Sequence, residues 1–164
     1  MTPDDLVVTK RGLRFQGQHF ACSIGKGGIV ANKQEGDGAT PGAILKITGC
    51  LYRPDRMNAP NSWAEPIRIG DLWSDASGDA AYNSLVKAPY AFSHEALRRA
   101  DPLYDLVLLT DWNWPDAKLG KGSAIFVHTW RKPRHPTEGC VALALPDLRF
   151  ISERICPGTR LILS

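Results

Sequence analysis

A chain of 164 residues is long enough to form one domain whose hydrophobic core needs no disulfide or metal. Hydrophobic residues make up 43% and charged residues 23%, close to the averages of soluble globular proteins, which argues against a disordered chain. With 20 basic and 17 acidic residues the net charge is +3, which is too small to indicate binding to nucleic acid.

Short apolar runs in the first fifty residues predict β-strands. Fifteen glycines and twelve prolines are scattered between such runs along the chain, which indicates many turns and a β-rich fold. Segment 52–91 is rich in Pro, Asn, Asp and Trp and is long for a simple connection, so we predict an ordered loop that covers a substrate cleft. The strands expected before it are Leu6–Thr9, Leu13–Phe15, His19–Ile24 and Ile44–Leu51.

The second half of the chain predicts two short helices and three more strands. Ser93 is a good N-cap, and a two-turn helix is expected from Ser93 to Arg99. Near-continuous apolar runs at Leu103–Thr110 and Ser123–His128 are typical of central strands covered on both faces. Pro146 suits the first turn of a last helix, which is followed by a terminal strand at Arg160–Leu163.

The four cysteines show no C-x-x-C pair and no regular spacing, so the sequence predicts neither a zinc site nor a disulfide framework. Cys22, Cys50 and Cys156 fall in apolar strand or helix contexts, where inert burial is expected.

The most informative stretch places a histidine at the end of one apolar strand and a cysteine at the start of the next. A catalytic thiol needs an imidazole that withdraws its proton, and His128 is the candidate base for Cys140. If the two strands are antiparallel neighbours joined by residues 129–139, the ring and the sulfur come within hydrogen-bond reach. Gly139 allows close backbone approach, and the N–H groups of Gly139 and Cys140 are candidate oxyanion donors.

A structural explanation of the same residues stays open at this point. Cysteine is among the most buried residue types, and a histidine that ends a strand is often a surface residue. A noncatalytic binding or scaffold domain, in which Cys140 and His128 would have no catalytic role, is the corresponding functional alternative.

The segment Thr137-Glu-Gly-Cys140-Val-Ala-Leu143, with His128 on the preceding strand, resembles the catalytic motif of L,D-transpeptidases. Gly36-Asp-Gly-Ala-Thr-Pro41 resembles the Thr-Pro element of that family, and Tyr104-Asp-Leu-Val with Asn113 resembles its central strand. The resemblance spans residues 6 to 163. It implies a mainly β catalytic domain over residues 1–164, an L,D-transpeptidase-like β-sandwich with two short helices and neither metal nor organic cofactor.

The resemblance also implies a reaction. Cys140 would attack the carbonyl of the third residue of a peptidoglycan stem peptide, usually diaminopimelate, and expel the terminal D-alanine. An amine would resolve the thioacyl-enzyme as a cross-link, whereas water would resolve it as a tripeptide. His128 would act as base and then as acid, and the backbone carbonyl of Thr129 would orient the imidazole.

Two departures from the family pattern affect the substrate pocket. Glu138 and Ala142 stand where many members have histidine and arginine, and Cys140 follows His128 by an interval of only twelve positions, shorter than is usual. A small basic cluster lies between His128 and Cys140 and consists of Arg131, Lys132, Arg134 and His135. It either forms a solvated loop or binds the carboxylates of the stem peptide. The substrate-binding candidates are Thr137, Glu138, Arg131 and Arg134, with Arg53 and Arg56 as weaker ones.

The sequence favours a cytoplasmic L,D-carboxypeptidase that trims tetrapeptides during wall recycling. The N-terminus carries acids where a secretory signal would carry Lys or Arg, and no run approaches the roughly 18 apolar residues of a membrane span. A periplasmic transpeptidase that forms 3-3 cross-links is the alternative if a signal peptide precedes Met1. The expected partner is a stem peptide or muropeptide, with no nucleic acid.

Overall fold

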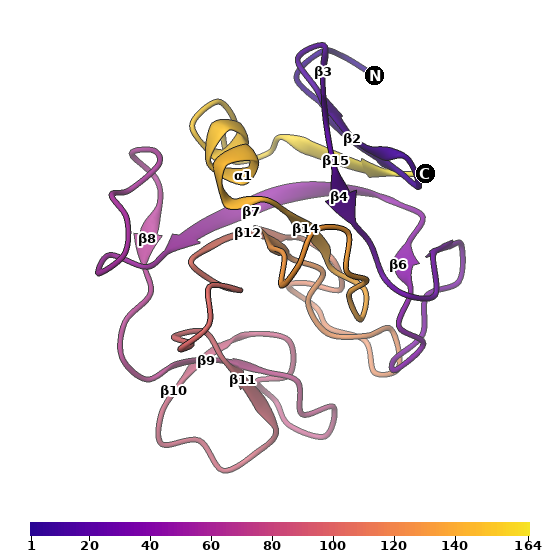
Figure 1. Cartoon of the computed structure of the whole chain (residues 1–164). Helices are drawn as coiled ribbons and strands as arrows, with labels where there is room; N and C mark the ends of the chain where they lie inside the picture. Colours follow the sequence, from indigo (N-terminus) through magenta and orange to yellow (C-terminus); the bar gives the residue numbers. More distant parts are fainter.

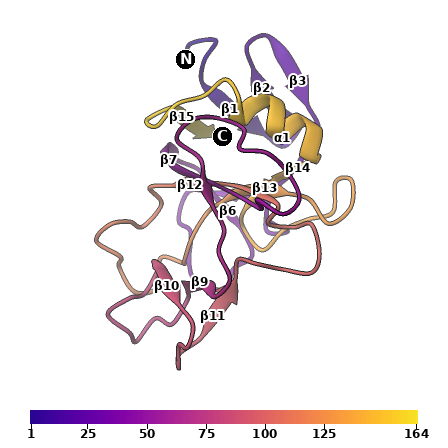
Figure 2. The same cartoon turned by 90° about the vertical axis from the view of Figure 1, so that its left-hand side faces the viewer.

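The computed structural model describes residues 1–164 and contains fifteen short strands and one helix (Figures 1 and 2). A ten-stranded sheet has the order β3-β2-β1-β15-β7-β12-β13-β14-β4, with β8 also paired to β7. Its strands are β1 (Leu6–Thr9), β2 (Gly12–Phe15), β3 (Gln18–Phe20), β4 (Cys22–Ser23), β7 (Ile44–Tyr52), β8 (Glu65–Pro66), β12 (Leu106–Thr110), β13 (Val127–Thr129), β14 (Val141–Leu143) and β15 (Arg160–Leu163). The mainly β fold predicted from the sequence is confirmed.

Two smaller sheets complete the fold. A three-stranded sheet has the order β10-β9-β11, and a parallel pair joins β5 to β6. The strands are β5 (Ile29–Val30), β6 (Thr40–Pro41), β9 (Asp71–Ser74), β10 (Leu85–Lys87) and β11 (His94–Ala96). In both views the three-stranded sheet lies on one side of the large sheet, and helix α1 (Leu145–Ser152) lies on the other (Figures 1 and 2).

The large sheet therefore has a hydrophobic core on each face. Because side chains alternate along a strand, Leu106 and Leu108 of β12 enter a core of 18 buried residues, whereas Val107 enters a second core of 7. The first core includes Leu148 of α1, and the second includes Trp73 of β9. Fully burying such a side chain contributes roughly 1.5–3 kcal/mol, so each core holds its covering layer in place. The sequence correctly indicated a central strand covered on both faces here.

The predicted last helix is present, with Pro146 in its first turn. It ends at Ser152, and Leu148 and Ile151 are its buried apolar residues. No helix of this chain is both long enough and apolar enough to cross a membrane.

The helix predicted from Ser93 to Arg99 is wrong. This segment contains β11, which pairs antiparallel with β9 so that His94 lies opposite Ser74 and Ala96 opposite Leu72. A favourable N-cap contributes only about 1 kcal/mol, and here the ladder with β9 supplies the backbone hydrogen bonds that a helix would have made internally. The fold thus has one short helix instead of two.

Segment 52–91 contains β8, β9 and β10, and is ordered as predicted. The ring of Trp73 from β9 meets the ring of Phe126 edge-on, with 5.0 Å between the ring centroids. This contact fixes the three-stranded sheet against the large sheet directly before β13, so segment 52–91 covers the face that carries His128.

Candidate active site

β13 and β14 pair in parallel, not antiparallel as the sequence suggested. Their register places Val127 opposite Val141 and His128 opposite Ala142. Antiparallel neighbours are commonly joined by very short turns, whereas the longer connection over residues 130–140 can carry the chain back to the starting end of β13. Cys140 therefore precedes β14 beside Phe126, and its side chain lies on the same face as that of His128.

The sulfur of Cys140 contacts the backbone of the strand beside it. The Phe126 N–H donates to Sγ at 3.3 Å, and the thiol points to the Ala124 carbonyl at 3.7 Å. Burial raises the pKa of the Cys140 thiol to about 12. No hydrogen bond joins the thiol to His128, which corrects the direct contact predicted from the sequence. The resting thiol is therefore protonated and held by the backbone.

His128 is a buried residue, only 5% exposed. Its Nδ1 lies 2.8 Å from the carbonyl of Thr129, and because a carbonyl can only accept, Nδ1 carries the hydrogen and Nε2 the lone pair. The ring of Tyr104 packs edge-on against it, with 5.4 Å between the ring centroids. Burial lowers the pKa of His128 to about 4. The ring is thus a neutral, oriented acceptor.

The glycine before the nucleophile is required by close packing. Gly139 has φ +145°, and a Cβ at this position would lie 2.9 Å from the carbonyl oxygen of Ala39. The hydroxyl of Thr40 donates to the Gly139 carbonyl at 2.8 Å and accepts from the Gly25 N–H at 2.8 Å. Through Thr40, strand β6 therefore holds the turn before Cys140 in place, and we call this pair of hydrogen bonds the Thr40 clamp.

Only one of the two predicted oxyanion donors is free. The Gly139 N–H donates to the Thr137 hydroxyl at 3.1 Å, and this hydroxyl in turn donates to the Cys140 carbonyl. The Cys140 N–H has no acceptor within the protein. Thr137 also exchanges backbone hydrogen bonds with Ile24 and Lys26, so its main role in the free protein is to hold the nucleophile turn.

Cys140 and His128 line one cavity of about 470 Å³. Of the substrate-binding candidates, Arg131, Thr137 and Glu138 also line it, whereas Arg134 does not. Arg131 is exposed and makes no ion pair within the protein, while Glu138 pairs with Lys26 at 2.8 Å. The opposite wall was not predicted from the sequence, and the helix expected at Ser93–Arg99 would present other side chains than β11 does. The residues that form it are His94, Glu95, Ala96, Arg99, Leu103 and Tyr104.

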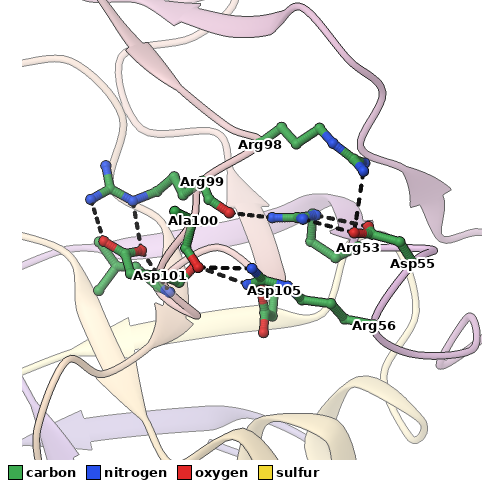
Figure 3. A network of polar contacts seen from close by, with 9 residues as sticks. Arg53, Asp55, Arg56, Arg98, Arg99, Ala100, Asp101 and Asp105 are labelled. Atoms are coloured by element: carbon green, nitrogen blue, oxygen red, sulfur yellow. Dashed lines mark hydrogen bonds and ion pairs between the residues drawn. The ribbon is translucent and has the colours of Figure 1, made fainter.

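An arginine network holds that opposite wall in position (Figure 3). Arg53 forms two hydrogen bonds with Asp55, at 3.0 and 2.9 Å, and also donates to the Arg99 carbonyl. Arg56 pairs with Asp105 at 2.6 Å. Both arginines are committed to partners in the protein, so the suggestion that they bind substrate carboxylates is wrong. Their role is to fix the segment that carries Arg99 and Tyr104.

The other cysteines lie outside this cavity. Burial raises the pKa of Cys22 to about 11 and that of Cys50 to about 12, which suits inert thiols. Cys156 is exposed, so the predicted burial of this residue is wrong. It follows the end of α1, where the chain turns toward β15 in solvent. No group of three or more His, Cys, Asp or Glu side chains is arranged to hold a metal ion.

The Thr40 clamp generates a stability prediction. Thr40→Val keeps the shape of the side chain but leaves the Gly25 N–H and the Gly139 carbonyl without their buried partner. We expect the free energy of unfolding to fall by about 2 kcal/mol or more, measured by urea denaturation. Thr40→Ser retains the hydroxyl and should recover most of this loss. Equal stability of the valine and serine variants would contradict the clamp.

The buried imidazole generates a pH prediction. Because the folded-state pKa of His128 is about 4 and the unfolded value is near 6.5, the unfolded chain binds more protons between these two values. Lowering the pH from 7 to 5 should therefore reduce the free energy of unfolding by about 2 kcal/mol through this residue. In urea unfolding, His128→Gln should lack this decrease in the free energy of unfolding between pH 7 and 5. His19→Gln changes an exposed histidine and should show the same decrease as wild type. The same pH dependence in wild type and His128→Gln would exclude a neutral buried ring.

The whole chain was also compared with known proteins. The family model described as the L,D-transpeptidase catalytic domain (YkuD) matches residues 4–163. No curated protein and no solved structure matches the chain. Because the family model covers nearly all of the sequence, the chain belongs to the L,D-transpeptidase catalytic-domain family.

Proposed function

We propose that this chain cleaves the bond between diaminopimelate and the terminal D-alanine of peptidoglycan tetrapeptides, through a thioester on Cys140. Membership of a family that acts on peptidoglycan supports the substrate class. The observation that carries the chemistry is that a thiol, a neutral imidazole and a free backbone N–H meet at one cavity.

Acylation begins with the Cys140 thiol and the His128 imidazole both uncharged. As Sγ bonds to the substrate carbonyl carbon, its proton passes to Nε2 of His128, and the developing oxyanion is stabilised by the Cys140 N–H. The C–N bond then breaks, and the imidazolium gives its proton to the departing amine of D-alanine. Because burial lowers the pKa of His128, its imidazolium is a strong proton donor at this step.

For the second step we propose water as acceptor. His128 takes a proton from water, the resulting hydroxide adds to the thioester carbonyl, and Cys140 leaves with the proton as the tripeptide carboxylic acid forms. Support comes from the short connection to Cys140, where residues 131–136 are all exposed, so that solvent reaches the cavity from this side. A role as a cytoplasmic carboxypeptidase in wall recycling stays a prediction from the sequence.

The size of the same cavity favours a second candidate, transfer to an amine. A volume of about 470 Å³ lies in the range of pockets that bind ligands with many more atoms than D-alanine. After D-alanine leaves, a second stem peptide would fit this space with its amine near His128. The product would then be a 3-3 cross-link.

The nucleophile is tested by Cys140→Ala. This change should lower D-alanine release from a disaccharide tetrapeptide by on the order of 10³-fold or more, because no other group can form the thioester. The measurement is D-alanine released per enzyme, with circular dichroism to show that the fold is kept. Cys156→Ala removes an exposed thiol away from the cavity and should release D-alanine at the wild-type rate. Retained turnover in Cys140→Ala would overturn the assignment, and no turnover by wild type would favour a noncatalytic binding domain.

The acceptor is tested by mass spectrometry of the products from disaccharide tetrapeptide. Water as acceptor predicts tripeptide and free D-alanine in equal amounts, because each thioester is hydrolysed once. Cross-linked dimers as the main product would show that the enzyme acts as a transpeptidase and would overturn the carboxypeptidase proposal. Addition of a competing D-amino acid at high concentration supplies a control, since an enzyme that accepts amines should incorporate it at the position of D-alanine.

A further inference from the structure

A second cavity of about 340 Å³ opens on the other side of Cys140. It shares Cys140, Glu95 and Glu138 with the first cavity, but His128 does not line it. Its outer walls are formed by the loop before β6, through Gly36 and Gly38, and by Asp75, which directly follows β9. The nucleophile therefore lies at the junction of two cavities, only one of which contains the base.

Four carboxylates line the second cavity, and three of them have partners within the protein. Such partners neutralise or satisfy the carboxylate oxygens, so these three residues have a structural use in the free protein. The three contacts are Glu35 with the Tyr82 hydroxyl at 2.8 Å, Glu95 with the Tyr104 hydroxyl, and Glu138 with Lys26 at 2.8 Å.

Asp75 is the exception. Its side chain accepts no hydrogen bond and forms no ion pair, although Oδ1 is shut off from solvent. Its backbone is fixed, because Asp75 directly follows β9 and its N–H donates to the Ser93 carbonyl at 3.2 Å. A carboxylate that lines a cavity without a counter-ion in the protein is available to bind a cationic group.

Lys33, the one basic residue that lines this cavity, does not pair with Asp75. The ammonium of Lys33 is held by Asp37 at 2.5 Å and by the Gln34 carbonyl at 2.7 Å. The side chain of Lys33 is also only 5% exposed, so the ion pair keeps it in place. The second cavity thus presents excess negative charge to whatever enters it.

The position of His128 decides which part of the substrate enters each cavity. Because the imidazolium must protonate the departing amine, the D-alanine lies in the first cavity. The acyl part, on the other side of the attacked carbonyl, then extends past Cys140 into the second cavity. On the basis of the proposed function, we propose that Asp75 binds the side-chain ammonium of the residue whose carbonyl Cys140 attacks.

A single contact between Asp75 and the substrate ammonium would account for the unpaired carboxylate of the second cavity. A carboxylate–ammonium hydrogen bond is charge-assisted, and it would give Asp75 the partner that the protein itself does not supply. The side chain of diaminopimelate carries such an ammonium group, on a distal carbon that also bears a carboxylate. Asp75 is therefore a specificity-determining residue that selects an amine-bearing third residue, and it takes no part in proton transfer.

The test compares two tetrapeptides that differ only in the third residue, one with a free side-chain amine and one with that amine acetylated. Wild type should release D-alanine from the free-amine peptide with a kcat/KM roughly 10- to 100-fold higher, since the acetylated peptide lacks the charge. Asp75→Asn should lose this preference through a higher KM for the free-amine peptide. Its rate on the acetylated peptide and the rate of Cys140 alkylation by iodoacetamide should stay at wild-type values.

Controls separate binding from stability. Asp116→Asn removes an exposed carboxylate that lines neither cavity and should keep the preference. The thermal midpoint of Asp75→Asn should not fall, because the free protein loses no hydrogen bond, and Asp75→Ser serves as a second variant if the amide disturbs the fold. Equal wild-type rates on both peptides, or an unchanged preference in both Asp75 variants, would overturn the inference. Release of D-alanine from neither peptide by wild type would overturn the proposed function itself, and this inference with it.

Discussion

The parallel pairing of β13 with β14 is the constraint on which the rest of the site depends. Its register aligns His128 with Ala142, and the alternation of side chains then directs Cys140 and His128 to the same face. A shift of one residue would send one of them into the opposite core. The Thr40 hydroxyl and the close packing of Gly139 against Ala39 secure the start of β14, so that the register and the orientation of the sulfur are fixed together.

Burial on this face determines the resting protonation states of Cys140 and His128. Desolvation disfavours both the thiolate and the imidazolium, so it raises the pKa of Cys140 and lowers that of His128. Proton transfer between them in the empty site would create two poorly solvated charges. In the proposed acylation step the same transfer is coupled to bond formation at the carbonyl, whose oxygen takes up the negative charge and accepts a hydrogen bond from the Cys140 N–H. The neutral pair thus suits a thiol that reacts with bound substrate and resists oxidation without it.

The cleft is built by elements that are far from the nucleophile in sequence. Glu95 lies in β11 and Asp75 directly follows β9, and the arginine network around Asp55 and Asp105 fixes the segment that carries Arg99 (Figure 3). The charged groups of that network all have partners. In contrast, the Cys140 N–H and the Asp75 carboxylate lack partners at the cleft itself, and polar groups left unsatisfied at one place are typical of a binding site.

The sequence by itself determined the nucleophile motif around Cys140, the pairing candidate His128, the mainly β class and the terminal helix and strand, because each rests on residue types and spacings within a few positions. The tertiary structure alone decided the direction of β14, since a connection of this length permits either direction. It also converted Ser93–Arg99 into β11, where the ladder with β9 outweighed the N-cap signal. The roles of charged residues followed the same rule: Arg53 and Arg56 were drawn into ion pairs and Asp75 was left without one, because the partners of a charge depend on which distant segments the fold brings beside it.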